Sequence, residues 1–362
     1  MNRKNFLTTI LPVTIATALY KNTKAAPFLV QPTLTPANLK IGDTIGVTCP
    51  ASPTDYNKIK EGIKALKHWG LNVQIGETVG KHWQRFGGTD MERAYDFQQM
   101  LDNDKIKAII FAKGGYGTMR MIDKVIWDKF LQKPKWLIGY SDLTTMHLHI
   151  HANFDIPTIH GDMVTGFGDQ PKDISANTLH DTLFGNRIEY SVGGHYMNRQ
   201  GYATGKLVGG NLSLIQACAG SKSDIKTDGK ILFIEDVSEY KYTIDRMMMN
   251  LKRSGKLENL AGLMVGMFTA TKQKEEEPFA ATIEEIIMEK VAEYKYPVCF
   301  NFPSGHVPYN HALKMGAFYD FSVSRKSVTL FEKYNVDTPT PSAPKKMVLD
   351  TLIKVDSLEG RL

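Results

Sequence analysis

The fold of this chain is decided by the stretch WLIGYSDL at residues 136–143. Residues 136–140 are largely apolar and predict a buried strand, while residues 142–152 predict a helix. Ser141 then stands at a strand-to-helix turn, as the nucleophile does in a Gly-x-Ser-x-Gly elbow. Leu143 replaces the second glycine of that pattern, and the alternative is that Ser141 or Asp142 only caps the helix.

Strands and helices alternate on both sides of this stretch. Ile59, Ile63 and Leu66 recur at helical spacing, and residues 108–112 are rich in isoleucine. The alternation predicts an α/β fold with a mostly parallel sheet covered on both faces, whose sites form at the carboxyl ends of strands. The predicted strands are 44–49, 72–75, 108–112, 136–140 and 157–160, and the predicted helices are 56–69, 90–101, 119–130 and 142–152.

A second unit of mixed α/β type is predicted after a polar, glycine-containing stretch at 187–205, which we interpret as a linker. The domain boundaries that follow are 40–190 and 205–333, with a proline-rich linker and tail at 334–362. The predicted strands of the second unit are 207–208, 231–235, 263–268, 298–302, 317–323 and 327–331, and its predicted helices are 212–219, 243–252 and 281–294.

Composition excludes several function classes. The net charge of +6 comes from basic residues interleaved with acidic ones, so nucleic acid is not an expected partner. The three cysteines, Cys49, Cys218 and Cys299, show no zinc-ligand spacing, and their odd number argues against a disulfide framework. We expect them to be small buried hydrophobic residues.

The N-terminus resembles an export signal. Basic Arg3 and Lys4 precede an apolar run at residues 6–20, and small residues at Ala25 and Ala26 suit cleavage. We therefore expect residues 1–26 to be a signal peptide and the protein to be periplasmic. The alternative is an N-terminal arm on a cytoplasmic protein. The run is too short for a membrane span of about 20 residues, so stable insertion is not expected.

Three distant segments would complete a hydrolytic site if they met in space. Ser141 follows one apolar strand, Glu235 ends another at 231–235, and His306 follows a third. Serine needs a base to take its proton, and that base needs a third group to fix its tautomer. Asp236 and Glu239 are rival carboxylates, and a surface position for Glu235 or a structural role for His306 is the alternative.

A glycine loop at residues 113–117 follows the third predicted strand. Backbone N–H groups of Gly114 or Gly115, with that of Asp142, would form an oxyanion hole. A dinucleotide loop is disfavoured because the final glycine of the Gly-x-Gly-x-x-Gly pattern is missing. A tight turn without chemistry is the remaining alternative.

Four histidines raise the question of a metal site. His147 and His151 would share one helix face, with His149 between them and His160 soon after. No HExxH pattern is present, so no metal and no cofactor are expected, and we interpret His147 as a packing residue near the turn.

Seven short motifs in the same order make the chain resemble the muramoyl-tetrapeptide L,D-carboxypeptidase family of serine peptidases, which includes the microcin C immunity protein. The resemblance runs from about residue 41 to residue 331. The motifs are FAKGGYG at 111–117, IGYSDLT at 138–144, TIHGDM at 158–163, GGNLSL at 209–214, FIEDVSE at 233–239, IDRM at 244–247 and GH at 305–306.

The resemblance implies a Ser141–His306–Glu235 triad, a flavodoxin-like or Rossmann-like N-terminal domain, a C-terminal domain with the glutamate and histidine, and a homodimer without metal. It also implies hydrolysis of murein tetrapeptides after an L-configured centre, with release of D-alanine. The identity of the third peptide residue, lysine or diaminopimelate, stays open. The alternatives are an amidase acting on peptidyl-nucleotide antibiotics of the microcin C kind and a non-catalytic two-domain periplasmic binding protein.

Two residues depart from the family pattern. Lys113 stands where the family often has arginine, and Asp162 stands where proline is common. Either change is expected to alter substrate contacts.

Overall fold

The computed structural model describes residues 34–167, 174–186, 188–273, 278–333 and 345–348. The described residues from Leu34 onwards form one compact unit that contains two sheets. The predicted signal peptide at 1–26 and most of the predicted tail at 334–362 lie outside the described residues. Within the described part of the chain, no helix is both long enough and apolar enough to span a membrane.

The first sheet has the order β11-β5-β4-β3-β1-β2. Its five N-terminal strands pair in parallel, as the alternation of strands and helices predicts. These strands are short and their central members are almost wholly buried, which is why they read as apolar runs. The strands are β1 (Thr44–Thr48), β2 (Asn72–Ile75), β3 (Ile106–Phe111), β4 (Trp136–Gly139) and β5 (Thr158–His160).

Helices connect these strands. In α1 (Tyr56–His68), Ile59, Ile63 and Leu66 are buried on one face. A capping box of Thr89 and Glu92 starts α2 (Asp90–Asp102). The single helix predicted at 119–130 is wrong, because the chain there forms three short, separate helical segments. The remaining helical elements of this half are α3 (Thr118–Met121), η1 (Ile122–Lys124), α4 (Asp128–Gln132), η2 (Ser141–Leu143), α5 (Thr144–Asn153), η3 (Val164–Gly166) and α6 (Ile174–Leu183).

The second sheet has the order β10-β9-β8-β7-β12-β13-β6-β14. The linker predicted at 187–205 is wrong, because β6 (Ile188–Gly193) pairs with β13 inside this sheet. The long strand β7 (Gly201–Asn211) pairs with β12 through its first half and with β8 through its second half. Polar residues alternate with buried ones in β6, which explains why the stretch does not read as a core strand.

The other elements of this half follow the predicted order with shifted ends. A second capping box, of Thr282 and Glu285, starts its last helix. The strands are β8 (Ile231–Val237), β9 (Gly262–Thr269), β10 (Val298–Cys299), β12 (Phe318–Val323), β13 (Ser327–Glu332) and β14 (Lys345–Val348), and the helices are α7 (Leu212–Ala217), α8 (Lys241–Arg253) and α9 (Ile283–Lys290).

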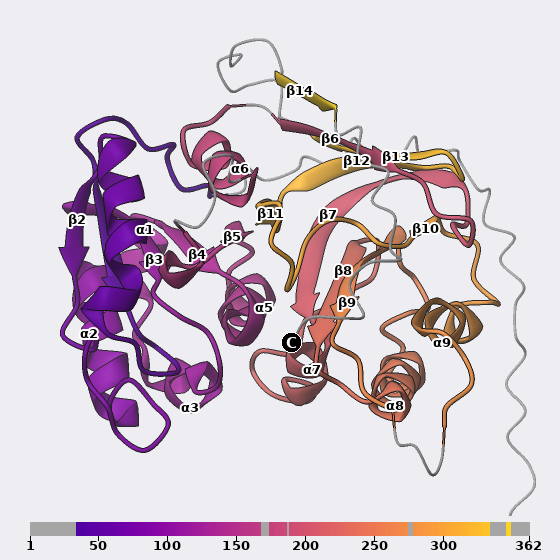
Figure 1. Ribbon diagram of the computed structural model, residues 1–362, viewed down its shortest axis with the longest axis horizontal. Coiled ribbons are helices and arrows are strands. Elements are labelled where there is room, and N and C mark those ends of the chain that lie inside the picture. Colours follow the sequence, from indigo (N-terminus) through magenta and orange to yellow (C-terminus); the bar gives the residue numbers. More distant parts are fainter. Residues whose placement is uncertain (1–33, 168–173, 187, 274–277, 334–344, 349–362) are drawn as a thin grey trace, which may run out of the picture. The chain divides into compact units, whose positions relative to one another are not determined.

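One strand joins the two halves of the chain. β11 (Leu313–Met315) comes after β10 of the second sheet but pairs antiparallel with β5 at the edge of the first sheet. Figure 1 shows β11 beside β5, although about 150 residues of sequence separate them. The loop between β10 and β11 therefore passes from one sheet to the other, and this loop carries His306.

Candidate active site

Ser141 lies at a strained turn between β4 and α5. Its φ is +63°, a left-handed conformation that costs a non-glycine residue about 1–3 kcal/mol. The alternative that Ser141 or Asp142 only caps the helix is wrong, since neither side chain makes a cap bond to it. Asp142 instead accepts a hydrogen bond from the backbone N–H of Thr118 at 2.8 Å. The strain is therefore not offset by a capping role of Ser141.

Glu235 and His306 complete a chain of hydrogen bonds with Ser141. The His306 Nδ1–H donates to Glu235 Oε2 at 2.7 Å, and His306 Nε2 lies 3.0 Å from Ser141 Oγ. Because a carboxylate only accepts, Nδ1 carries the proton and Nε2 is left to accept from the serine hydroxyl. The structure thus brings together the serine, the histidine and the glutamate that the sequence singled out.

The two rival carboxylates have other partners. Asp236 accepts from Asn211 Nδ2 at 2.9 Å and from the backbone N–H of Ser213 at 2.9 Å, at the start of α7. Glu239 Oε1 lies 3.2 Å from Ser213 Oγ. Glu235 is therefore the carboxylate that faces His306.

Burial and charge act in opposite directions on His306. Burial by itself lowers the pKa of this imidazole, but the hydrogen bond to Glu235 and the negative charges of Glu235 and Asp236 outweigh it and raise the pKa above its usual value. Glu235 is fully buried, and burial raises the pKa of its carboxyl against the opposing effect of His306. The pair is thus arranged so that a positive charge on His306 is favoured, as proton transfer from a serine requires.

The glycine loop lies against Ser141. A methyl group placed on Gly114 would come 3.3 Å from the Cβ of Ser141. Gly115 has a φ of +103°, and a side chain there would overlap Ser52 Oγ. Of the predicted oxyanion-hole residues in this loop, Gly114 therefore lies directly against Ser141, and Gly115 follows it in the chain against Ser52.

A buried arginine that the sequence analysis did not single out supports this loop. The Arg93 guanidinium is fully buried in α2 and donates to the carbonyl oxygens of Pro50 and, at 2.8 Å, Gly117. It therefore connects two loops at the carboxyl ends of β1 and β3. A lone arginine in an amphipathic helix carries no pattern by which sequence alone could have revealed this contact.

The histidines of α5 are buried. His147 is fully buried, donates through Nε2 to the carbonyl of Gly139 at 2.8 Å and lies 2.8 Å from Thr158 Oγ1. It therefore supports the strand that precedes Ser141. In the described ranges, no group of three or more histidine, cysteine, aspartate or glutamate side chains could hold a metal ion.

Acid is expected to destabilise the protein through His147, whose pKa burial lowers to about 4. In the unfolded chain this pKa is about 6.5, so the unfolded state binds the proton more tightly, and stability is lost as the pH falls from 6.5 towards 4. The full loss is about 3 kcal/mol. Urea unfolding at pH 7 and pH 4.5 should show a smaller pH effect in His147→Gln. The exposed His68, replaced in the same way, should leave the pH effect unchanged; equal effects in all three proteins would contradict the assignment.

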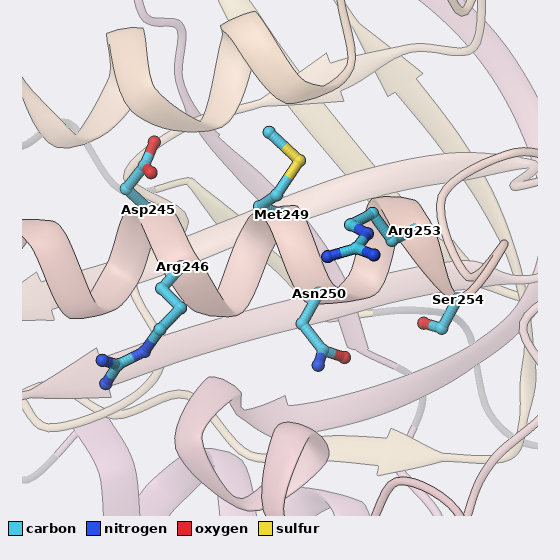
Figure 2. Close-up of a pocket in the computed structure, with 6 residues that line it drawn as sticks. All are labelled: Asp245, Arg246, Met249, Asn250, Arg253 and Ser254. Carbon is cyan, nitrogen blue, oxygen red and sulfur yellow. The ribbon is translucent and has the colours of Figure 1, made fainter.

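Figure 2 shows a hollow elsewhere on the surface, along α8. Its lining residues all belong to α8 or directly follow it, and none of Ser141, Glu235 or His306 is among them. They are Asp245, Arg246, Met249, Asn250, Arg253 and Ser254. The hollow is thus separate from the Ser141 site.

Comparison with known protein families agrees with a hydrolytic role for the Ser141, His306 and Glu235 site. Residues 45–161 match the LD-carboxypeptidase N-terminal domain, and residues 204–321 match the LD-carboxypeptidase C-terminal domain. These matches cover well over half of the chain. The protein is therefore a peptidase. It belongs to the LD-carboxypeptidase family.

Individual relatives agree with this assignment. The chain is 33% identical to the "Probable murein peptide carboxypeptidase" of Bacillus subtilis, over 82% of this chain and 93% of the relative. It is 28% identical to the murein tetrapeptide carboxypeptidase of Pseudomonas aeruginosa, over 76% of this chain and 92% of the relative. The microcin C7 self-immunity protein MccF of Escherichia coli is 25% identical, over 82% of this chain and 96% of the relative.

A solved structure confirms the fold class. The structure of MccF in complex with glutamyl sulfamoyl guanosine matches with a TM-score of 0.74 at 23% identity, over 82% of this chain and 98% of that chain. The α/β fold with two sheets, expected from the sequence, is thus confirmed.

Proposed function

We propose that the protein is a serine-type L,D-carboxypeptidase that hydrolyses murein tetrapeptides and releases the terminal D-alanine. The observation that carries the proposal is the hydrogen-bonded series Ser141–His306–Glu235 at the junction of the two sheets. Further support comes from the family and from relatives named for murein peptides. The family consists of peptidases, so the periplasmic binding protein alternative is unsupported.

The first chemical step follows from the geometry. His306 Nε2 takes the hydroxyl proton while Ser141 Oγ attacks the carbonyl carbon of the L,D-peptide bond. Glu235 holds the imidazole in the required tautomer and stabilises its cationic form. His306 then gives the proton to the departing amine of D-alanine, which leaves an acyl-serine.

The negative oxygen of the tetrahedral intermediate needs hydrogen-bond donors. We assign this role to the backbone N–H groups of Asp142 and of Gly114 or Gly115, because Asp142 follows Ser141 in the chain and Gly114 lies against Ser141. The loss of one such donor costs about 2.7–4 kcal/mol of transition-state stabilisation. Water then attacks the acyl-serine with His306 as base, which releases the tripeptide and restores the hydroxyl.

One assay tests this function. The purified protein is incubated with murein tetrapeptides that contain lysine or diaminopimelate at position three, and with analogues of D configuration at that centre. Free D-alanine, measured by mass spectrometry, is expected only from the L-configured substrates. Release from both configurations, or from neither, would contradict the L,D-specificity.

A second candidate is hydrolysis of a peptidyl-nucleotide, and exposed aromatic rings favour it. The rings of Trp83 and Tyr116 are each 38% exposed, and both lie near the Phe86 ring, at centroid distances of 6.0 and 5.6 Å. Tyr116 belongs to the same loop as Gly114, beside Ser141. Such rings can stack on a nucleobase, and the relative MccF was solved with a sulfamoyl guanosine compound.

Trp83→Ala distinguishes the two candidates. If a base stacks on Trp83, the variant should lose about tenfold in kcat/KM for glutamyl sulfamoyl guanosine and keep its activity on the free tetrapeptide. Tyr95→Ala removes another exposed ring, on α2, and serves as the matched control. Unchanged kcat/KM for the nucleotide in Trp83→Ala would remove the support for this candidate.

We further propose, from the sequence, that the protein is exported to the periplasm and acts as a homodimer. Residues 1–26 carry the proposed signal, and cell fractionation with N-terminal sequencing of the mature protein tests it. Light scattering of the purified protein tests the dimer, and a monomeric mass at micromolar concentration would rule it out.

A further inference from the structure

Asp162 is a buried carboxylate just beyond β5 that the proposed chemistry does not use. Its side chain is 8% exposed, so its charge needs a hydrogen-bond donor. Asn310, which is fully buried in the loop between β10 and β11, donates from Nδ2 to Asp162 Oδ1 at 3.0 Å. This contact joins the first sheet to the loop that carries His306.

The other end of the Asn310 side chain organises that loop. Its Oδ1 accepts from the backbone N–H of Gly305 at 2.9 Å and lies 3.2 Å from Ser304 Oγ. An N–H requires an acceptor, so the amide oxygen faces Gly305 and the amide nitrogen faces Asp162. One amide therefore holds the two residues directly before His306 and ties them to Asp162.

The loop has little room to move at this point. Gly305 has a φ of +121°, and a side chain there would come 2.8 Å from Glu235 Oε2. His306, the next residue, must reach Glu235 on one side and Ser141 on the other. A misplacement of about 1 Å between reacting groups can cost about 100-fold in rate.

Asp162 is also tied to β4, the strand that precedes Ser141. It lies two residues after His160, and His160 pairs with Gly139 between β5 and β4. Gly139 is two residues before Ser141. The path Gly139, His160, Asp162, Asn310, Gly305 therefore connects the serine to the histidine through the protein frame.

We propose that Asp162 and Asn310 form a positioning pair that holds His306 in register with Ser141. The proposal rests on the proposed serine mechanism and deepens it. Neither residue is assigned a contact with substrate. Asp162, a departure from the family pattern, then acts on the base through Asn310 instead of on the substrate.

A charge-exchange series tests the pair. Asn310→Asp places a second carboxylate against Asp162 and removes the donor, so kcat should fall about 100-fold with KM little changed. Asp162→Asn alone should lose less, because the new amide can present its oxygen to Asn310. Asp162→Asn combined with Asn310→Asp restores a donor opposite an acceptor and should recover at least tenfold of the loss.

Two readouts separate the positioning role from the proposed function. D-alanine release reports on the murein reaction, and the rate of labelling by a fluorophosphonate probe reports on Ser141 without any peptide. In labelling, Oγ bonds to phosphorus, fluoride leaves and His306 takes the proton. Asp162→Ala is a further variant, expected to slow labelling about tenfold, and it serves if Asn310→Asp does not fold by circular dichroism.

The outcomes are distinct. Wild-type rates in a folded Asn310→Asp variant, or no recovery in the double variant, overturn the positioning pair and leave the function intact. Fast labelling of the wild type without D-alanine release overturns the murein substrate, while the labelling rates of the variants still decide the role of the pair. A wild type that is neither labelled nor active overturns both.

Discussion

Replacing Ser141 by alanine is expected to lower kcat for D-alanine release by about 10⁴-fold or more, with the fold unchanged. The variant removes the atom that forms the acyl bond and keeps the other groups in place. It also keeps the strained backbone, since alanine at a φ of +63° bears the same strain as serine. Thermal unfolding should therefore give nearly the same Tm for both proteins.

The control for this prediction is Ser324→Ala, in the turn between β12 and β13. Among the residues that the structure describes, that hydroxyl bonds only within its own turn, where it accepts from the backbone N–H groups of Lys326 and Ser327 and lies near the oxygens of Ser327. D-alanine release and probe labelling should both survive in Ser324→Ala and both disappear in Ser141→Ala. Undiminished turnover in a folded Ser141→Ala variant would refute the assigned nucleophile.

The parallel sheet could be predicted because its strands are buried on both faces. Residues such as Ile109 and Ile110 are fully buried, and this burial makes β3 a continuous apolar run that local pattern reveals. The strand β6 is half-buried, and its alternating polar residues resemble those of a linker. Its place in the sheet depends on pairing with β13, more than 130 residues later, which no local window contains.

In the site, too, some features could be predicted from local sequence and others could not. Ser141, Glu235 and His306 could be singled out because each follows or ends an apolar strand, where parallel sheets collect their reactive groups. The strain at Ser141 and the hydrogen bond that the Thr118 N–H donates to Asp142 could not be predicted, because helix-capping preference favours another role for serine and aspartate. No sequence pattern pointed to Asn310, because its proposed role depends on two hydrogen bonds of its side-chain amide, to Gly305 and to Asp162, that exist only in the folded protein.

The crossing of the chain between sheets is the feature that makes the site possible. β11 leaves the second half of the chain and pairs with β5, so the His306 loop is fixed at both of its ends. A base on such a loop is held by backbone pairing as well as by its own hydrogen bonds. This arrangement explains how His306 Nε2 and Ser141 Oγ lie 3.0 Å apart although 165 positions separate the two residues in sequence.

Glu235→Gln is expected to reduce kcat by about 10³–10⁴-fold at pH 8, because glutamine can also donate to Nδ1 and stabilise the wrong tautomer of His306. The pH profile should change as well. In the wild type, Glu235 raises the pKa of His306 above the usual 6.5 of a histidine. Activity is lost as the pH falls through this raised pKa. Without the carboxylate, burial dominates and lowers this pKa, so the acid limb of the residual activity moves to lower pH.

The comparison with Glu239→Gln makes the shift diagnostic. Glu239 is a carboxylate of the same segment, but its contact is with Ser213 and not with His306. Its variant should keep the acid limb of kcat/KM where the wild type has it. The direction of the shift carries the information, because burial lowers the pKa of His306 and the Glu235 carboxylate raises it. An unmoved limb in Glu235→Gln would therefore show that Glu235 does not control the protonation of His306, whatever the loss in rate.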